Sequence, residues 1–184
     1  MSSIKVAMFI GSNRGASLNQ KLASAVEALA PTSLIFERIE IADLPFCDAD
    51  QESSPPPEVE RLKAALARNQ AAFFVTPEFN RSIPAVIKNA IDIGSRPMAD
   101  NSWRDMPVGM TGTSPGPIGT AVGQQHLRQI LSVLGAHVLP GEAYIAFNPP
   151  TLIDSDGQVE NEGTRDFIAA YVARFAEFAG LITS

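Results

Sequence analysis

Residues 11–19 read Gly11-Ser12-Asn13-Arg14-Gly15-Ala16-Ser17-Leu18-Asn19, and this stretch is the most informative about the fold class. It follows an apolar run, residues 6–10, that predicts a buried strand, and it precedes an amphipathic run, residues 18–29, that predicts a helix. A strand that turns through small residues into a helix leaves backbone N–H groups unpaired at the positive end of the helix dipole. Such a turn is typical of an anion site.

The side chains of this turn indicate which anion it suits. Ser12, Ser17 and Asn19 are neutral donors, and Arg14 adds one positive charge. Hydroxyls, an amide and a single guanidinium favour one terminal phosphate, as in a phosphate monoester. An ordinary helix start with Ser17 as its N-cap explains the same residues and stays open as an alternative.

Two better-known phosphate motifs do not fit the turn. A dinucleotide fingerprint needs glycine at its middle and last positions, where this chain has Asn13 and Ala16. A triphosphate P-loop ends in Gly-Lys-Ser/Thr, and that sequence is absent from the turn.

Composition limits the classes of protein that this chain can be. A length of 184 residues suits a single domain, which we expect to span residues 1–184. A net charge of −6 without a Lys/Arg cluster argues against a nucleic-acid partner. The N-terminus lacks a signal-peptide pattern, and no apolar run is long enough to span a membrane. The single cysteine, Cys47, fits a reducing cytoplasm, and with two distant histidines it argues against a metal site.

Strands and helices alternate along the chain. We expect strands over residues 6–10, 33–41, 71–76, 107–111 and 137–139, with residues 143–146 as an optional continuation of the last strand. We expect helices over 18–29, 58–69, 85–93, 119–134 and 162–180. This pattern predicts an α/β fold, a three-layer sandwich with a five-stranded parallel sheet of flavodoxin-like order 2-1-3-4-5 and helices on both faces. Ligands of such sheets bind beyond the carboxyl ends of the strands, so the loops after strands one, three and four should form the site.

The loops after strands three and four have unusual sequences. Residues 76–84 carry prolines at both ends and Phe79 between them, which predicts a stiff loop that could present backbone groups and a ring face to a flat ligand. Residues 112–116 match the Gly-x-Ser-x-Gly pattern of serine hydrolases. That function is disfavoured because Pro115 has no N–H for an oxyanion hole and because no histidine follows His137.

Taken together, the loops resemble those of the NADPH-dependent FMN reductase family, which includes quinone, chromate and azo-dye reductases. The matching stretches are Gly11-Ser12-Asn13-Arg14 with Ser17 and Asn19, Pro77-Glu78-Phe79-Asn80 with Ser82 and Pro84, Lys88-Asn89-Ala90-Ile91-Asp92 followed by Ser95-Arg96-Pro97, and Ser114-Pro115-Gly116 with Gln125-His126-Leu127-Arg128. The spacing fits over nearly the whole chain, and the Pro-Glu-aromatic-Asn loop is the most specific stretch.

The resemblance implies FMN as the cofactor and assigns residues to its parts. The first loop would hold the phosphate, the second would line the isoalloxazine largely through its backbone, and the third would support the other side of the ring. These expected cofactor-binding residues are Ser12, Arg14, Ser17, Leu18, Asn19, Pro77, Glu78, Phe79, Asn80, Thr113, Ser114 and Gly116. The family has tyrosine more often at position 79, so Phe79 retains the ring face and lacks the hydroxyl.

The resemblance also implies an activity. NADPH or NADH would deliver hydride to the flavin, and a small-molecule acceptor such as a quinone, azo compound, chromate or free flavin would then take the electrons in a ping-pong scheme. This chemistry needs no acid or base from the protein, so we name no catalytic residue. Arg14, or less favourably Arg81, could meet the 2′-phosphate of NADPH. The family commonly forms homodimers or homotetramers.

Two other functions remain open at the level of sequence. A flavodoxin-like electron carrier would share the FMN site and show little turnover with NADPH. A non-enzymatic flavin-binding or regulatory protein could also use this fold, because fold alone does not determine function.

Overall fold

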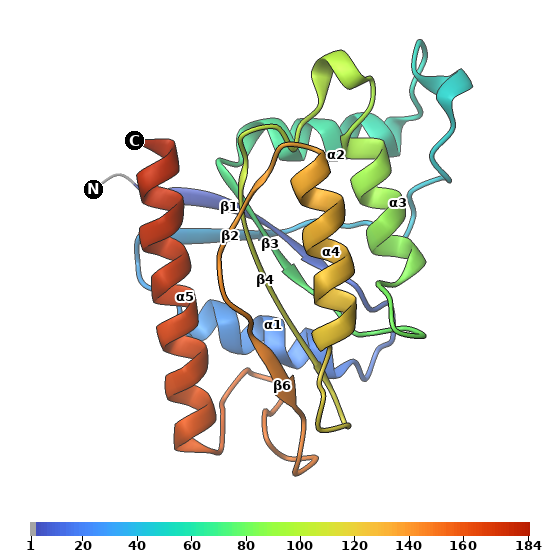
Figure 1. Cartoon of the computed structure of the whole chain (residues 1–184). Coiled ribbons are helices and arrows are strands. Elements are labelled where there is room, and N and C mark those ends of the chain that lie inside the picture. Colours follow the sequence, from blue (N-terminus) through green and yellow to red (C-terminus); the bar gives the residue numbers. More distant parts are fainter. Residues whose placement is uncertain (1–2) are drawn as a thin grey trace.

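The computed structural model describes residues 3–184 and places helices on both sides of a parallel sheet (Figure 1). The strands are β1 (Ile4–Ile10), β2 (Leu34–Arg38), β3 (Ala71–Val75), β4 (Pro107–Ser114), β5 (His137–Val138) and β6 (Tyr144–Ala146). Their order is β2-β1-β3-β4-β5, with β6 also pairing with β4. The predicted order of the sheet is confirmed.

The helices follow the strands as the sequence predicts. They are α1 (Leu18–Leu29), α2 (Pro57–Arg68), α3 (Ala85–Gly94), α4 (Ala121–Val133) and α5 (Glu162–Thr183), with two short 3₁₀ helices, η1 (Ala49–Gln51) and η2 (Met98–Asp100). Helix α4 begins two residues later than expected because Gly119 has a φ of +60°. It ends at Val133, one residue before its predicted end, and Gly135 with a φ of +86° terminates it.

Two hydrophobic cores lie on opposite faces of the sheet. One core joins β1 and β3 to α1 and α5, with Phe73 packed edge-on against Phe175. The other joins the sheet to α2, α3 and α4, and buries Trp103, whose ring N–H donates to the Ile91 carbonyl. Strands β1 and β3 are buried on both faces, which explains their nearly continuous apolar sequences. The result is the predicted three-layer sandwich.

The fifth position of the sheet differs from the expected single strand. Strand β5 pairs with the start of β4, at Pro107 and Val108, and β6 pairs with its end, at residues 112–114. Between them, Pro140 has no N–H to donate and Gly141 has a φ of +86°. The edge is therefore interrupted, while β4 extends three residues beyond its predicted end.

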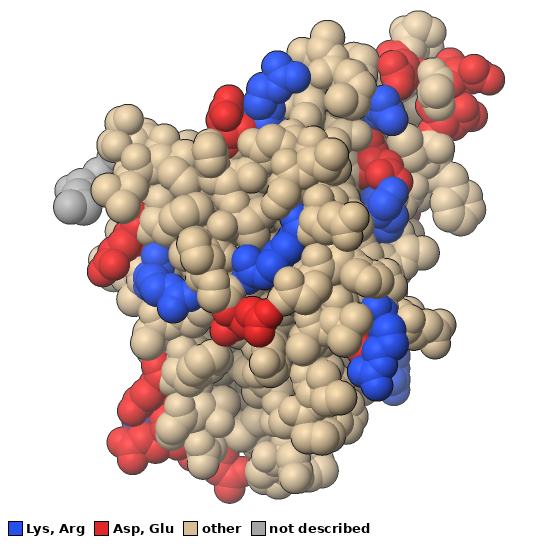
Figure 2. Space-filling view, viewed as in Figure 1, with Lys and Arg blue, Asp and Glu red and all other residues tan. Residues whose placement is uncertain are grey.

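The described helices and the surface charges show no strongly apolar span and no large patch of one sign on the face drawn in Figure 2. Within residues 3–184, no helix is both long enough and apolar enough to cross a membrane. On the face shown in Figure 2, basic and acidic side chains lie interspersed in small groups.

Candidate cofactor site at the carboxyl ends of the strands

The loops after β1, β3 and β4 meet at one edge of the sheet. The Gly11 N–H donates to the Val75 carbonyl at 2.9 Å, and the Thr76 N–H donates to the Thr111 carbonyl at 3.0 Å. These contacts leave no room for side chains: a Cβ on Gly11 would lie 2.5 Å from the Thr76 hydroxyl oxygen. A Cβ on Gly112 would lie 2.1 Å from the Thr76 carbonyl oxygen. The two glycines therefore allow the three loops to lie directly against one another.

The loop after β1 leaves its backbone donors unused. Among the described residues 3–184, no hydrogen bond uses any backbone N–H of the eight residues 12–19 as donor. Ser17 is the N-cap of α1, and its hydroxyl accepts from the Gln20 N–H at 3.3 Å. Residues 13–16 are exposed, so these donors are open to a ligand at the helix N-terminus.

Ser12 and Arg14 also line a cleft toward β2. The cleft encloses about 560 Å³ between residues 10–15 and residues 38–42. Its other guanidinium, on Arg38, is paired with Glu27 at 2.6 Å, whereas no acidic group in the described part of the chain pairs with Arg14. Arg14 is therefore the cation of this loop that a bound anion can use.

Asn19 joins the first loop to the third. Its side-chain NH₂ donates to the Thr113 carbonyl at 3.1 Å, and its side-chain oxygen accepts from the Thr113 N–H at 3.1 Å. Asn19 is buried, and Leu18 packs against the core of α1 and α5. The side chains of Leu18 and Asn19 were expected to bind the cofactor, but both make contacts within the protein. They hold the first turn of α1 against β4 and the core and so position the loop.

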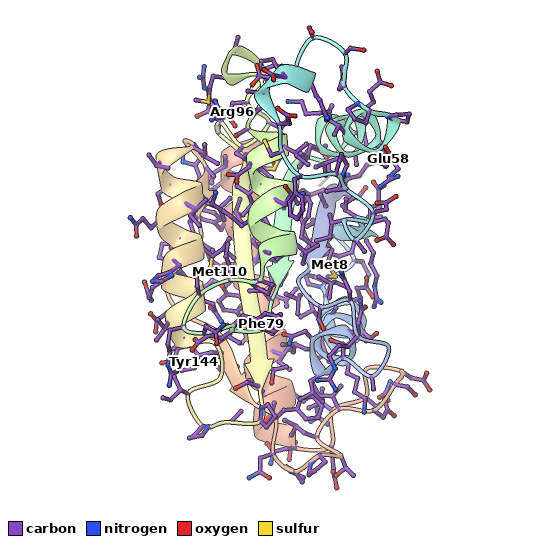
Figure 3. The ribbon with its side chains drawn as sticks, turned by 90° about the vertical axis from the view of Figure 1, so that its right-hand side faces the viewer. Met8, Glu58, Phe79, Arg96, Met110 and Tyr144 are labelled. Carbon is purple, nitrogen blue, oxygen red and sulfur yellow. The ribbon has the colours of Figure 1, made fainter. Side chains whose placement is uncertain are left out.

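The loop after β3 contains a tight hairpin. Phe79 and Ser82 exchange two backbone hydrogen bonds of 2.8 Å each, and the two residues between them, Asn80 and Arg81, have φ values of 49° and 65°. Positive φ at both central positions is typical of a type I′ turn. The Phe79 side chain is 55% exposed and lies in front of β4, toward the same end of the molecule as Tyr144 (Figure 3).

Glu78 lies at the base of this hairpin and is almost covered. Its side chain is 8% exposed, one carboxylate oxygen accepts from the Gly123 N–H at 3.0 Å, and the other pairs with Arg81 at 2.9 Å. Burial acts to raise the pKa of Glu78, but the Gly123 N–H and Arg81 outweigh it and hold the pKa below its ordinary value. Arg81 thus forms a salt bridge with Glu78, whereas the sequence offered it as a less favoured partner for the 2′-phosphate of NADPH.

The loop after β4 is held mainly by its own hydroxyls. Thr113 is buried and its hydroxyl donates to the Ile145 carbonyl at 2.7 Å, while the Ser114 hydroxyl donates to the Gly119 carbonyl at 2.8 Å. Gly116 has open space around it, since a Cβ there would meet only the Ser114 hydroxyl, at 3.7 Å. Thr113 and Ser114 shape this loop, and Gly116 leaves its surface accessible.

Sequence reasoning missed the contacts between the hairpin and α4. Gly123 faces Glu78, and the ring Nδ1 of His126 lies 3.0 Å from the Ser82 hydroxyl. The signal that could have revealed them is a glycine inside a helical pattern, which often marks a close approach of another segment. A separate hollow of about 240 Å³ lies among residues 46–63 and 93–100 and contains none of the expected site residues.

The sequence of this chain is similar to those of known flavin-dependent reductases. The sequence model of the NADPH-dependent FMN reductase family matches residues 4–149. A quinone reductase of Pseudomonas putida is 41% identical over 178 residues, covering 96% of this chain and 95% of the relative. A 2-hydroxy-1,4-benzoquinone reductase of a Burkholderia species is 35% identical, covering 94% of each chain.

Solved structures give the same result. FerB, a flavoenzyme NAD(P)H:(acceptor) oxidoreductase from Paracoccus denitrificans, has a TM-score of 0.92 at 38% identity, covering 97% of this chain and 98% of its own. A flavodoxin from Pseudomonas aeruginosa has a TM-score of 0.57 at 19% identity, covering 98% of this chain and 100% of its own. The flavodoxin shows a shared fold only.

Proposed function

This chain belongs to the NADPH-dependent FMN reductase family, and we propose that it reduces small-molecule acceptors, quinones foremost, in a ping-pong reaction. Family membership makes the protein an oxidoreductase with FMN as cofactor and a nicotinamide nucleotide as hydride donor. The finer assignments of residues and acceptors below are our proposal, for the whole chain 1–184 acting as one FMN-binding domain.

One observation carries the assignment of the cofactor site. The eight free N–H groups of residues 12–19 surround a helix N-terminus, and Arg14 stands beside them without an acidic partner in the described part of the chain. This donor set fits the dianionic phosphate of FMN. We propose that Ser12, Arg14 and the backbone up to Ser17 bind the phosphate, while Leu18 and Asn19 hold the loop in place.

The other two loops fit the flat ring of FMN. Phe79 offers an exposed ring face, Asn80 is exposed in the turn beside it, and the backbone at Gly116 stays open. The Pro77 carbonyl accepts from the Thr76 hydroxyl at 3.1 Å, which stiffens the start of the hairpin. The covered carboxylate of Glu78 faces α4 and so supports the hairpin from behind. We propose that these loops form the two walls of the ring site.

In the proposed reaction the protein positions the cofactor and the substrates, and it supplies no acid or base. FMN supplies the redox group when bound. NADPH, a proton and a quinone give NADP⁺ and a hydroquinone, with nicotinamide and quinone occupying the same place one after the other. The chain binds and orients these flat molecules, and Phe79 at the mouth of the site offers them a stacking surface. Azo compounds, chromate and free flavin are further proposed acceptors.

Absorbance of flavin tests this proposal directly. The protein is loaded with FMN, desalted and then mixed with NADPH without oxygen. We expect that the flavin absorbance is retained and that NADPH bleaches it at least as fast as the steady-state turnover. We also expect parallel double-reciprocal lines when the concentrations of NADPH and a benzoquinone are varied. Retained flavin that NADPH does not bleach would indicate an electron carrier instead, and absence of retained flavin together with no turnover of free FMN would contradict the proposal.

Assembly and location complete the proposal. We propose a homodimer or homotetramer, supported by large apolar side chains on the surface, among them Val133 of α4 at 83% exposure and Phe46 at 85%. Sedimentation should give a mass of two or four chains, and a monomer would contradict this part. The exposed Cys47 thiol fits the reducing cytoplasm that we propose as the location.

A further inference from the structure

We propose that the Glu78 carboxylate is a positioning residue that clamps the hairpin after β3 to helix α4 and so fixes the ring site for FMN. The inference rests on the proposed function, because it assigns a role within that same site. Glu78 was expected to act largely through its backbone, whereas its side chain bonds to the first turn of α4.

The Glu78 carboxylate is almost completely covered. A glutamate side chain that is only 8% exposed must be compensated, and here both oxygens are used. The Gly123 N–H belongs to the first turn of α4, where backbone donors have no partner within the helix. Glu78 therefore caps α4 from a different segment, and its negative charge lies at the positive end of that helix dipole.

The hairpin after β3 lies very close to helix α4. A Cβ on Gly123 would lie 3.1 Å from the Ser82 carbonyl oxygen and 3.4 Å from the Glu78 Cγ. The His126 ring adds a second link, 3.0 Å from the Ser82 hydroxyl. A Cβ at position 123 would require the hairpin to move away by a few tenths of an ångström, so glycine allows the closest approach of the hairpin to α4.

The clamp joins two segments of the proposed ring site. The hairpin carries Phe79, and α4 follows directly on the loop that contains Gly116. These segments form the two proposed walls of the ring site. Because Glu78 bonds one wall to the helix that continues the other, it sets their separation. Loss of the clamp should weaken FMN binding while the sheet and both cores remain intact.

Two variants break the clamp in different ways, and FMN itself is the probe. Glu78→Ala removes the acceptor for the Gly123 N–H and the partner of Arg81, and should raise the Kd for FMN about tenfold or more. Gly123→Ala leaves all charges in place, yet its Cβ requires the hairpin to move by a few tenths of an ångström. We expect the Kd for FMN to rise at least about threefold, while the unfolding midpoint stays equal or rises because the higher helix propensity of alanine offsets the cost of this small displacement.

Controls separate positioning from general weakening. Glu37→Ala removes another carboxylate paired with an arginine, Arg68, on β2 and so outside the three loops, and should leave the Kd for FMN unchanged. Glu78→Gln retains an acceptor oxygen for Gly123 and should fall between the wild type and Glu78→Ala. If Glu78→Ala does not fold, Gly123→Ala carries the test.

The outcomes distinguish the inference from the proposed function. If the wild type binds no flavin, the proposed function fails, and the clamp fails with it. If the wild type binds FMN and both Glu78→Ala and Gly123→Ala bind it equally well, the clamp alone is overturned. Weaker FMN binding in Gly123→Ala without loss of stability supports the clamp, since a purely structural role would lower FMN affinity and stability together.

Discussion

The loop after β1 and the hairpin after β3 lie at the same edge of the sheet but differ in how many of their hydrogen-bonding groups are paired within the protein. The first loop leaves the N–H groups of residues 12–19 without a partner in the described part of the chain. The hairpin uses its groups internally, through the Phe79–Ser82 pair and the Glu78 clamp. Free donors at a helix N-terminus favour binding of charge, whereas saturated groups favour a stiff wall against which a flat molecule can lie.

The largest expected effect concerns the link between the first loop and β4. Asn19→Ala should lower the free energy of unfolding by about 2 kcal/mol or more, because it leaves the buried N–H and carbonyl of Thr113 unpaired. Urea unfolding at neutral pH measures this. The matched control is Asn13→Ala in the same loop, which is exposed and should change stability by less than about 0.5 kcal/mol. Equal losses in both variants would refute the positioning role of Asn19.

The next effect tests whether the free loop binds charge. Arg14→Ala should raise the Kd for FMN about tenfold, equal to about 1.4 kcal/mol, through loss of a charge-assisted bond to phosphate. Binding of riboflavin, which has no phosphate, should stay the same, and so should the unfolding midpoint. Fluorescence titration with both flavins measures the difference. A variant that loses affinity for both flavins equally would place Arg14 elsewhere than at the phosphate.

A smaller effect concerns the exposed ring of the hairpin. Phe79→Ala should lower kcat/KM for a benzoquinone about three- to tenfold, because stacking of one aromatic face contributes about 1 kcal/mol. Phe79→Tyr retains the ring and should stay within about twofold of the wild type. Steady-state kinetics with FMN in excess checks both variants. Unchanged kinetics in Phe79→Ala would show that the hairpin is a wall without a stacking role.

The smallest effect is a dependence of stability on pH. The folded state holds the pKa of Glu78 below its ordinary value, so the clamp stabilises the fold above that ordinary value, and this stability is lost as the pH falls through the folded pKa. Between about pH 7 and about pH 3, the wild type should therefore lose more stability than Glu78→Gln. Urea unfolding at both values gives the comparison. Identical losses in the two proteins would contradict the lowered pKa.

The fold was predictable because its signals are local. Alternating strands and helices, the apolar runs of β1 and β3, and the cap at Ser17 each depend on neighbouring residues, and the structure confirms them. The interruption between β5 and β6 was only partly foreseen, because Pro140 and Gly141 mark a break without showing that both halves return to β4.

The candidate site was predictable as a set of loops and less so as a set of side chains. Sequence identified the stretches around Ser12, Phe79 and Gly116, because turn residues mark them. It did not reveal that the amide of Asn19 and the hydroxyl of Thr113 are used within the protein. Such contacts join residues far apart in the chain, and only the packed structure shows them.

Comparing the affinities of FMN and riboflavin for the wild-type protein tests the central claim most directly. The two ligands share the ring and differ in the phosphate, so their ratio isolates the contribution of the loop after β1. With its free N–H groups and Arg14, the loop should make FMN bind at least about 100-fold more tightly than riboflavin in isothermal titration calorimetry. Equal affinities would contradict the claim that residues 12–19 form a phosphate site.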